Sequence, residues 1–470
     1  MNTLNKNFID KCVCDCHSVT CDKNTENNHS TLEFPTCSSE LNDSIIKNFQ
    51  LCDTRRDNFN LISSIDWDQS GDCLLSCSRN NTITLHNISC KRSLFFLFLF
   101  FNLFIFQNDL SVRQFYSKKY GAHGARFLHG GESCCIVAAK TPDNTKNNTV
   151  SQILNSLCRT TWDVPSSQYT QFRLTNDQML HQKTRPKPDP PAGSLKYWDL
   201  RENRFVSNFF LRSAVSLQAQ LSVSLPPNEL ICAPCMDGTV QFFNVTKKKP
   251  MAILETGMTS SVHAFLEQKG NVAAVQILPF TIQLLDFRKS FEKAHYMSID
   301  VTTSLHKSYD EMKSLCITNI QLSQWPCLTL LVTLVDIMGQ PTLLEYDAQT
   351  GELLHRFYTS TSVSTQHLIE RWKCDPIDPL SYGRPIQFSP HISRDGRYIA
   401  CGCGAQSTLA FWSTKSDGLP IKTLSTGTRV ARQVQWNPTQ MLLASAYDHL
   451  AFWGPLDSYW GYKKSKNSFG

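Results

Sequence analysis

The chain has 470 residues, of which 41% are hydrophobic, 18% charged and 11% aromatic. These proportions are those of a globular protein, and they exclude a wholly disordered, collagen-like or multi-span membrane chain. The formal net charge of +6 is too small and too evenly spread to indicate nucleic acid as the main partner. Nineteen cysteines in a long chain whose first ten residues lack an apolar signal segment indicate a reduced, intracellular protein.

Residues 1–44 are rich in Asn, Ser, Thr and Cys, and we expect them to form a disordered tail. The tail contains a cluster of thiols with one imidazole, namely Cys12, Cys14, Cys16, His17 and Cys21. Such groups bind zinc in closely spaced pairs that a longer spacer separates, and this spacing is missing from the cluster. We therefore predict neither a metal site nor a cofactor.

The segment 93–106 reads SLFFLFLFFNLFIF and is almost entirely Phe and Leu. It is shorter than the roughly 20 apolar residues of a membrane-spanning helix, and Asn102 interrupts it. A membrane anchor and a buried strand or helix remain open alternatives, with the membrane disfavoured. Because pyrimidine-rich codons encode Phe, Leu and Ser, and pyrimidine tracts lie at the end of many introns, we favour translated intron sequence or an error in the gene structure.

Seven short segments repeat one pattern, in which alternating residues lead to an aromatic residue or Leu and then to a small or polar residue. They end at Asn87, Asp199, Asn244, Asp286, Asp347, Ser413 and Gly454. Upstream lies a second pattern, such as SIDWDQSGDCLLSCS at 64–78, with an alternating strand, a polar turn and a run of small and apolar residues. Strands joined by such turns form hairpins, and four strands in about 40–45 residues form one blade of a propeller.

The spacing of the seven segments supports a propeller. Three of the six intervals are 45, 42 and 41 residues long, which is the period of a blade. The first interval, from Asn87 to Asp199, is 112 residues long and contains both the apolar run 93–106 and the stretch 141–191. Without these two segments it falls to 47 residues, and the sequence therefore predicts seven blades.

The stretch 141–191 is rich in Asn, Thr, Gln and Ser and ends in KTRPKPDPP. It has no sustained period of a strand or a helix, and its prolines favour an extended, solvated chain. We predict a disordered loop that projects from the second blade. An unspliced segment and a partner-binding loop remain alternatives.

A propeller closes its ring because an open blade leaves a strand edge unpaired. The seventh copy ends at Gly454 with little chain left, whereas IIKNFQ at 45–50 stands just before the first blade. We expect this N-terminal segment to supply the outer strand of the last blade. The predicted fold is all-β, a seven-bladed propeller over 45–455 followed by a tail at 456–470.

The repeats resemble WD repeats, although only Trp198-Asp199 is a true WD pair and most copies lack the usual opening Gly-His. Four stretches carry a closer resemblance: FYSKKYG at 115–121, DWDQSGDCLLSCSRNNTITLHN at 66–87, LLDFRKSFEKAHY at 284–296 and VQWNPTQMLLASAYDHLAFWGP at 434–455. Together they resemble the small WD-repeat subunit of COMPASS-type histone H3 lysine-4 methyltransferase complexes. Relatives of that subunit also serve in a protein phosphatase 1 complex and, in fungi, in mRNA cleavage and polyadenylation.

The resemblance implies a nuclear, non-catalytic scaffold that binds a SET-domain methyltransferase subunit and links it to chromatin and to RNA polymerase II with a phosphorylated C-terminal domain. A phosphoserine carries close to two negative charges and strong acceptor oxygens. Lys118 and Lys119 offer ammonium donors, and Tyr116 and Tyr120 offer aromatic faces, for such a peptide. The alternative is a solvated loop whose lysines lie beside a core aromatic. We expect no direct nucleic-acid partner.

An Asp and an Arg lie two residues apart at the ends of two repeat segments, where Trp198 precedes Asp199 and Arg201, and Leu285 precedes Asp286 and Arg288. We expect each pair to hold adjacent blades together. The same pattern resembles the box by which some WD-repeat proteins dock on cullin-type ubiquitin ligases. A substrate receptor for ubiquitination is therefore the alternative function.

The sequence contains no G-x-S-x-G elbow, no H-E-x-x-H helix and no Walker-type phosphate loop. Gly402 and Gly404 lie in the stretch CGCG, which no predicted helix follows, and small residues packed in a propeller strand explain them. We therefore predict that the protein has no enzyme activity of its own.

Overall fold

A computed structural model describes most of the chain between residues 41 and 455. The described residues are 41–55, 60–88, 112–117, 121–129, 131, 133–139, 172–173, 193–216, 220–247, 249–258, 262–305, 315–324, 327–336, 340–359, 388–404, 407–415, 418–427 and 430–455. The chain divides into two compact units, Met1–Phe34 and Pro35–Gly470, and all described residues belong to the second. The tail 456–470, the apolar run 93–106 and residues 1–40 of the predicted tail 1–44 lie outside the described residues. Residues 41–44 of that tail are described, and Asn42 and Asp43 cap and begin helix α1 (Asp43–Lys47) instead of forming disordered chain.

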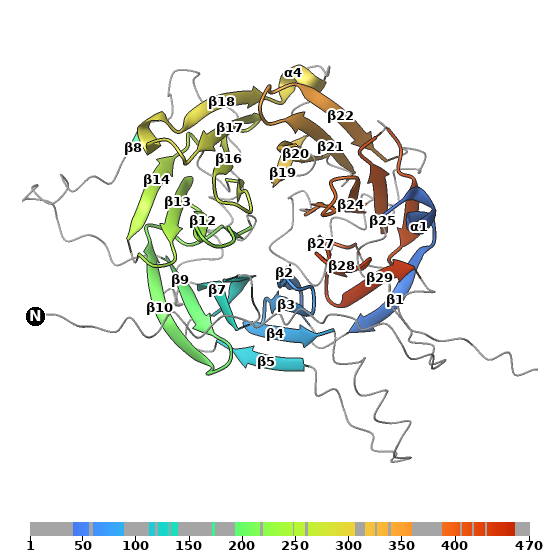
Figure 1. Cartoon of the computed structure of the whole chain (residues 1–470), viewed down its shortest axis with the longest axis horizontal. Coiled ribbons are helices and arrows are strands. Elements are labelled where there is room, and N and C mark those ends of the chain that lie inside the picture. The colour runs from blue at the N-terminus through green and yellow to red at the C-terminus, as the bar shows by residue number, and fades with distance from the viewer. Residues whose placement is uncertain are drawn as a thin grey trace, which may run out of the picture. The chain divides into compact units, whose positions relative to one another are not determined.

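Seven antiparallel sheets of at least four strands make up the described fold, with the first strand of each innermost and the fourth outermost (Figure 1). Blade 1 contains β2 (Ile62–Trp67), β3 (Cys73–Ser78), β4 (Thr82–Asn87) and β5 (Val112–Tyr116). Blade 2 contains β6 (His123–Phe127), β7 (Cys134–Ala139), β9 (Gly193–Asp199) and β10 (Arg204–Leu211). Blade 3 contains β11 (Ser222–Val223), β12 (Leu230–Pro234), β13 (Thr239–Asn244) and β14 (Pro250–Glu255).

The remaining blades follow in chain order. Blade 4 contains β15 (Ala264–Leu266), β16 (Val272–Leu278), β17 (Thr281–Asp286) and β18 (His295–Asp300), with the 3-10 turn η3 (Phe291–Lys293). Helix α4 (Thr302–Leu305) precedes blade 5, which contains β19 (Cys316–Ser323), β20 (Thr329–Val335), β21 (Pro341–Asp347) and β22 (Leu353–Tyr358). Blade 6 contains β23 (His391–Ile392), β24 (Tyr398–Cys403), β25 (Thr408–Ser413) and β26 (Lys422–Ser425). Blade 7 contains β27 (Gln433–Trp436), β28 (Leu443–Ala446), β29 (Leu450–Pro455) and β1 (Phe49–Arg55).

The seven repeated sequence segments are the third strands of the seven blades. Each is buried over most of its length, as in β13, where Thr239 to Phe243 are all buried. Third strands are buried on both faces because a blade packs against a neighbour on each side. The prediction of a seven-bladed propeller is confirmed.

A separate hydrophobic cluster fills the space between each pair of adjacent blades, including blades 7 and 1. Between blades 7 and 1, the Trp67 and Phe452 rings meet edge to face with centroids 6.3 Å apart. Between blades 1 and 2, the Phe115 and Trp198 rings are 5.9 Å apart. Since each cluster involves only two neighbours, the ring is stable only when all seven contacts form.

The N-terminal strand closes blade 7, but it begins later than predicted. β1 pairs antiparallel with β29, with Phe49 opposite Pro455 and Arg55 opposite Leu450, and the two strands lie side by side in blue and red (Figure 1). Most of the expected segment 45–50 instead belongs to helix α1 (Asp43–Lys47) and its C-cap. The Asn42 side chain accepts a hydrogen bond from the Ile45 N–H at 3.0 Å and caps the helix, which is why the strand cannot start at residue 45.

The stretch 141–191 contains one described element, the two-residue strand β8 (Phe172–Arg173). β8 pairs antiparallel with the outer strand β14, so that Phe172 is opposite Leu254 and Arg173 is opposite Ile253. Blade 3 thereby has a fifth strand, which the sequence did not predict. The rest of the stretch lies outside the described residues.

Candidate functional site

The antiparallel order of the strands gives the ring two distinct ends. At the lower end, as we define it, first strands connect to second strands and third strands to fourth strands. At the upper end, second strands connect to third strands and each blade connects to the next. Every predicted site residue that the structure describes lies next to one of these connections, because loops rather than strands carry most binding groups on a rigid scaffold.

The predicted phosphopeptide segment lies at the upper end, after the last strand of blade 1. Tyr116 is the last residue of β5, and its side chain is 56% exposed. The backbone N–H of Ser117 donates to the Asn81 carbonyl at 3.1 Å, and the N–H of Ala122 donates to the Asn81 side chain at 3.3 Å. Asn81 therefore holds both ends of the segment, whose Lys118, Lys119 and Tyr120 lie outside the described residues.

The two Asp-x-Arg pairs lie at the opposite, lower end, where β9 and β17 stop. Asp199 Oδ1 accepts from the backbone N–H of Arg201 at 2.9 Å, and Asp286 Oδ1 accepts from the N–H of Arg288 at 3.0 Å. In the second turn the side chains also pair, with Arg288 Nη2 donating to Asp286 Oδ2 at 2.8 Å, and this lowers the pKa of Asp286.

The Asp286–Arg288 pair closes its own turn, and its Arg288 side chain remains 68% exposed. The residue of this motif that contacts a neighbouring blade is Trp198, whose ring is 3% exposed and meets Phe115 of blade 1. Its indole N–H donates to Asn203 Oδ1 at 3.2 Å within blade 2. Trp198 therefore has a packing role, whereas blade joining and adaptor docking by the Asp and Arg residues stay predictions.

A polar network that the sequence did not reveal crosses the interior of the ring. Gln220, between blades 2 and 3, donates through its amide to Ser389 Oγ and, at 2.7 Å, to Gln433 Oε1 at the start of blade 7. Arg126 of β6 donates to Gln220 Oε1 at 2.9 Å and to Asp66 Oδ1 at 3.1 Å. The network joins blades that are not neighbours and pairs the mostly buried Arg126 cation with a carboxylate.

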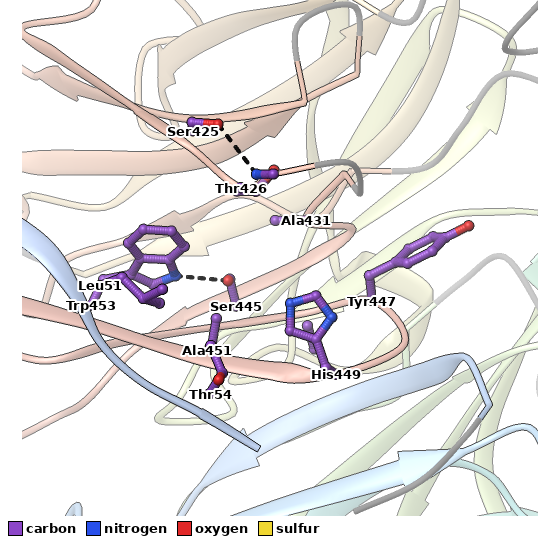
Figure 2. Close-up of a pocket in the computed structure, with 12 residues that line it drawn as sticks. Leu51, Thr54, Ser425, Thr426, Ala431, Ser445, Tyr447, His449, Ala451 and Trp453 are labelled. Carbon is purple, nitrogen blue, oxygen red and sulfur yellow. Dashed lines mark hydrogen bonds between the residues drawn. The ribbon is translucent and has the colours of Figure 1, made fainter. Parts of the chain in front are cut away.

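A small pocket of about 270 Å³ opens between blades 6 and 7, beside the closing strand (Figure 2). Leu51 and Thr54 of β1 line it, together with Trp453 and His449. The Trp453 indole N–H donates to Ser445 Oγ at 2.8 Å, so that the ring offers its apolar surface to the pocket. The volume lies below the range of small-molecule sites, and it suits a single apolar side chain of a bound peptide.

Four of the described thiols have pKa values that keep them protonated at neutral pH. Burial raises the pKa of Cys52 to about 11 and of Cys235 to about 12, and it raises the pKa values of Cys135 and Cys401 as well. A protonated thiol is neither a good nucleophile nor a metal ligand. Among the described residues no three His, Cys, Asp or Glu side chains form a metal-binding group, and the CVCDCHSVTC cluster lies outside them.

No helix in the described ranges is long and apolar enough to cross a membrane. Gly402, whose stretch CGCG raised the question of a phosphate loop, lies in β24 instead. A Cβ at Gly402 would lie 1.8 Å from the Ala431 carbonyl oxygen, so only glycine fits this close approach of blades 6 and 7. The interpretation of the stretch as a packed strand agrees with this geometry.

A family profile for the WD domain, G-beta repeat, matches residues 52–87. This range joins the outer strand of blade 7 to the first three strands of blade 1, so that the sequence repeat straddles two blades. The chain is a WD-repeat propeller protein. It is 20% identical over 422 residues to WD repeat-containing protein 82 of Drosophila melanogaster. The aligned region covers 88% of this chain and 97% of that protein.

A WD-repeat propeller is a scaffold for protein–protein contacts, since its rigid blades present loops at two ends. From the sequence of this WD-repeat protein we could predict that the site segments lie on loops, but not how these loops are arranged in space. The cross-ring network was missed because Arg126, Gln220 and Gln433 are far apart in sequence and lie in short or irregular segments. An isolated Arg in the alternating segment HGARF was the one available signal.

Proposed function

We propose that the protein is a non-catalytic scaffold subunit of a nuclear histone H3 lysine-4 methyltransferase complex, which it links to chromatin and to phosphorylated RNA polymerase II. The observation that carries the proposal is the segment FYSKKYG, which resembles that family and whose described Tyr116 is exposed at the upper end of the closed ring. The likeness along 97% of WD repeat-containing protein 82 supports the comparison of whole propellers.

The proposal is tested by purifying the tagged full-length chain from nuclear extract and identifying the bound proteins by mass spectrometry. We expect a SET-domain methyltransferase subunit to co-purify. Recovery of protein phosphatase 1 subunits alone, or of mRNA cleavage factors alone, would assign the chain to those complexes instead. A chain that stays outside the nucleus contradicts the proposal.

The binding site is tested with a phosphorylated peptide of the polymerase repeat. Lys118→Glu with Lys119→Glu replaces two positive charges by two negative ones, and we expect affinity to fall about tenfold or more. Lys47→Glu with Lys415→Glu is the matched control, because both lysines are exposed and lie away from the segment. Equal affinity of all three proteins would remove the site from FYSKKYG.

The exposed arginines of the two Asp-x-Arg turns favour a second candidate function, a substrate receptor of a cullin-type ubiquitin ligase. Arg201 and Arg288 both extend into solvent at the lower end, where an adaptor could reach them. For this function Arg201→Ala abolishes adaptor binding in a pull-down without changing the melting temperature. If the variant unfolds or binds normally, the residue is structural or unrelated to docking.

A further inference from the structure

Five exposed lysines gather at the lower end of blades 3 and 4, and none of them is among the predicted site residues. They are Lys247, Lys249, Lys269, Lys289 and Lys293, which we name the basic surface; the last two share their loop with the predicted Asp286–Arg288 turn. The first two follow the third strand of blade 3, and the last two follow the third strand of blade 4. Lys269 lies between them, in the turn that joins β15 to β16.

Hydrogen bonds connect these loops from one blade to the next and fix their order. Asn244, at the end of β13, donates through its side chain to the Asn228 carbonyl at 3.2 Å. Asn228 in turn donates to the Lys269 carbonyl at 2.9 Å. The N–H of Phe287 donates to the Asn271 carbonyl at 2.7 Å, which joins the Lys269 turn to the loop of Lys289. The basic surface is therefore a continuous and well-positioned feature.

Three nearby carboxylates whose side chains are described are engaged by other groups. Asp286 pairs with Arg288, and Glu229 Oε1 lies 2.5 Å from His129 Nδ1. Glu267 is buried, where it accepts from the Gln324 side chain and, at 3.1 Å, from the Val272 N–H. Within the part of the chain that the structure describes, no carboxylate forms an ion pair with any lysine of the basic surface. Its positive charge is thus available to a partner.

Two half-buried aromatic rings lie among the lysines. The Phe287 centroid is 5.1 Å from that of Phe291 and 4.9 Å from that of the buried Phe242. The two partly exposed rings offer apolar contact beside the charges. On such surfaces the charges attract the incoming chain, and apolar contacts at the centre of the interface hold it. The surface therefore fits a polypeptide with both acidic and apolar side chains.

We propose that the basic surface is a second docking site, which binds a carboxylate-rich segment of a partner protein at the end of the ring opposite FYSKKYG. The inference rests on the scaffold role proposed above and adds a partner chemistry to it. Lysines suit spread carboxylates because they act as flexible point charges. Nucleic acid is less suitable, since the partly buried Phe287 and Phe291 already pack against each other and do not present free faces for stacking bases.

The test uses the full-length protein and a fluorescein-labelled peptide in which Glu alternates with Leu, followed by fluorescence anisotropy. We expect saturable binding that weakens as salt is added, because exposed charges are screened over about 10 Å at 0.1 M ionic strength. Lys289→Glu with Lys293→Glu should lower affinity about tenfold or more. Lys47→Glu with Lys415→Glu carries the same change of charge and should bind as the wild type does.

Three results would overturn the inference. The first is equal affinity of the Lys289/Lys293 variant and the wild type, and the second is an equal loss in the control, which would show a response to net charge alone. The third is a labelled single-stranded DNA that binds tighter than the peptide and loses affinity in the same variant. Circular dichroism confirms that each variant is folded. Co-purification of the methyltransferase subunit is a separate readout, so that either proposal can fail alone.

Discussion

Buried histidines determine how the protein responds to acid. His86 is 1% exposed and its ring nitrogen lies 3.0 Å from Ser76 Oγ, and His263 is 5% exposed. Burial, together with the nearby Arg55 charge, lowers the pKa of His86 to about 3, and burial lowers the pKa of His263 to about 4. Both rings are therefore neutral in the folded protein wherever the unfolded chain would protonate them.

We predict that the free energy of unfolding falls as the pH drops from about 6.5 toward about 4. The unfolded chain binds these protons first, because each folded pKa lies below the unfolded value near 6.5, so stability present at pH 7 is lost on acidification. At pH 5 the loss is about 2 kcal/mol for each histidine. Urea unfolding at a series of pH values measures the slope of the free energy of unfolding against pH.

The slope can be assigned with single variants. His263→Gln should make the loss of stability with acid shallower, whatever the variant costs in absolute stability, because one of the two titrating groups is gone while His86 remains. A wild-type stability that is constant between pH 7 and pH 5 would contradict the proposed origin.

At the scale of single elements, the closing strand β1 contributes mainly through one side chain. Phe49 is 1% exposed, and its ring meets those of Phe411 and Trp436 with both centroid distances at 5.7 Å. Leu51, two residues along the same strand, is 49% exposed. The strand thus joins blades 6 and 7 through its buried end.

We predict that Phe49→Ala lowers the free energy of unfolding by about 3–5 kcal/mol, the usual cost of removing a buried phenyl ring. Leu51→Ala, in the same strand, should cost less than about 1 kcal/mol because about half of its surface is already in water. Urea denaturation of both variants and the wild type provides the measurement. Similar losses for the two would mean that β1 is held by backbone pairing rather than by the Phe49 ring.

The sequence predicted the third strands well and the first strands poorly. A third strand such as β17, TIQLLD, is buried on both faces and recurs at the period of a blade, so both composition and spacing identify it. First strands such as β11 and β23 have only two residues each and leave no pattern. The closing strand was placed too early because its helix signal, Asn42 followed by Asp43, stands next to a strand signal.

The candidate site was predictable only as segments. FYSKKYG and the Asp-x-Arg turns are visible in the sequence, yet their location at opposite ends follows only from the antiparallel order of the strands. The basic surface combines lysines from three loops of two blades, and its lysines look like ordinary solvated charges one by one. What distinguishes them is that nearby Asp286 and Glu267 are engaged by other groups, which is a property of the folded chain.

At the scale of the whole ring, the two ends allow two partners to bind at once. The upper end carries Tyr116, and the lower end carries the basic surface and the exposed Arg201 and Arg288. The cross-ring network through Arg126 and Gln220 occupies the interior with the protein's own polar groups. Two partners that dock at opposite ends of this ring would therefore not compete for the same surface.

The pairing of β1 with β29 also sets the timing of biogenesis. The ribosome makes Phe49–Arg55 early but Leu450–Pro455 only about 395 residues later, a delay of roughly 20–80 s at ordinary translation speeds. During that interval the nascent chain is an open arc, and Phe49 has none of its aromatic partners for most of it. A product that ends before residue 450 lacks the strand with which β1 pairs, and its ring cannot close.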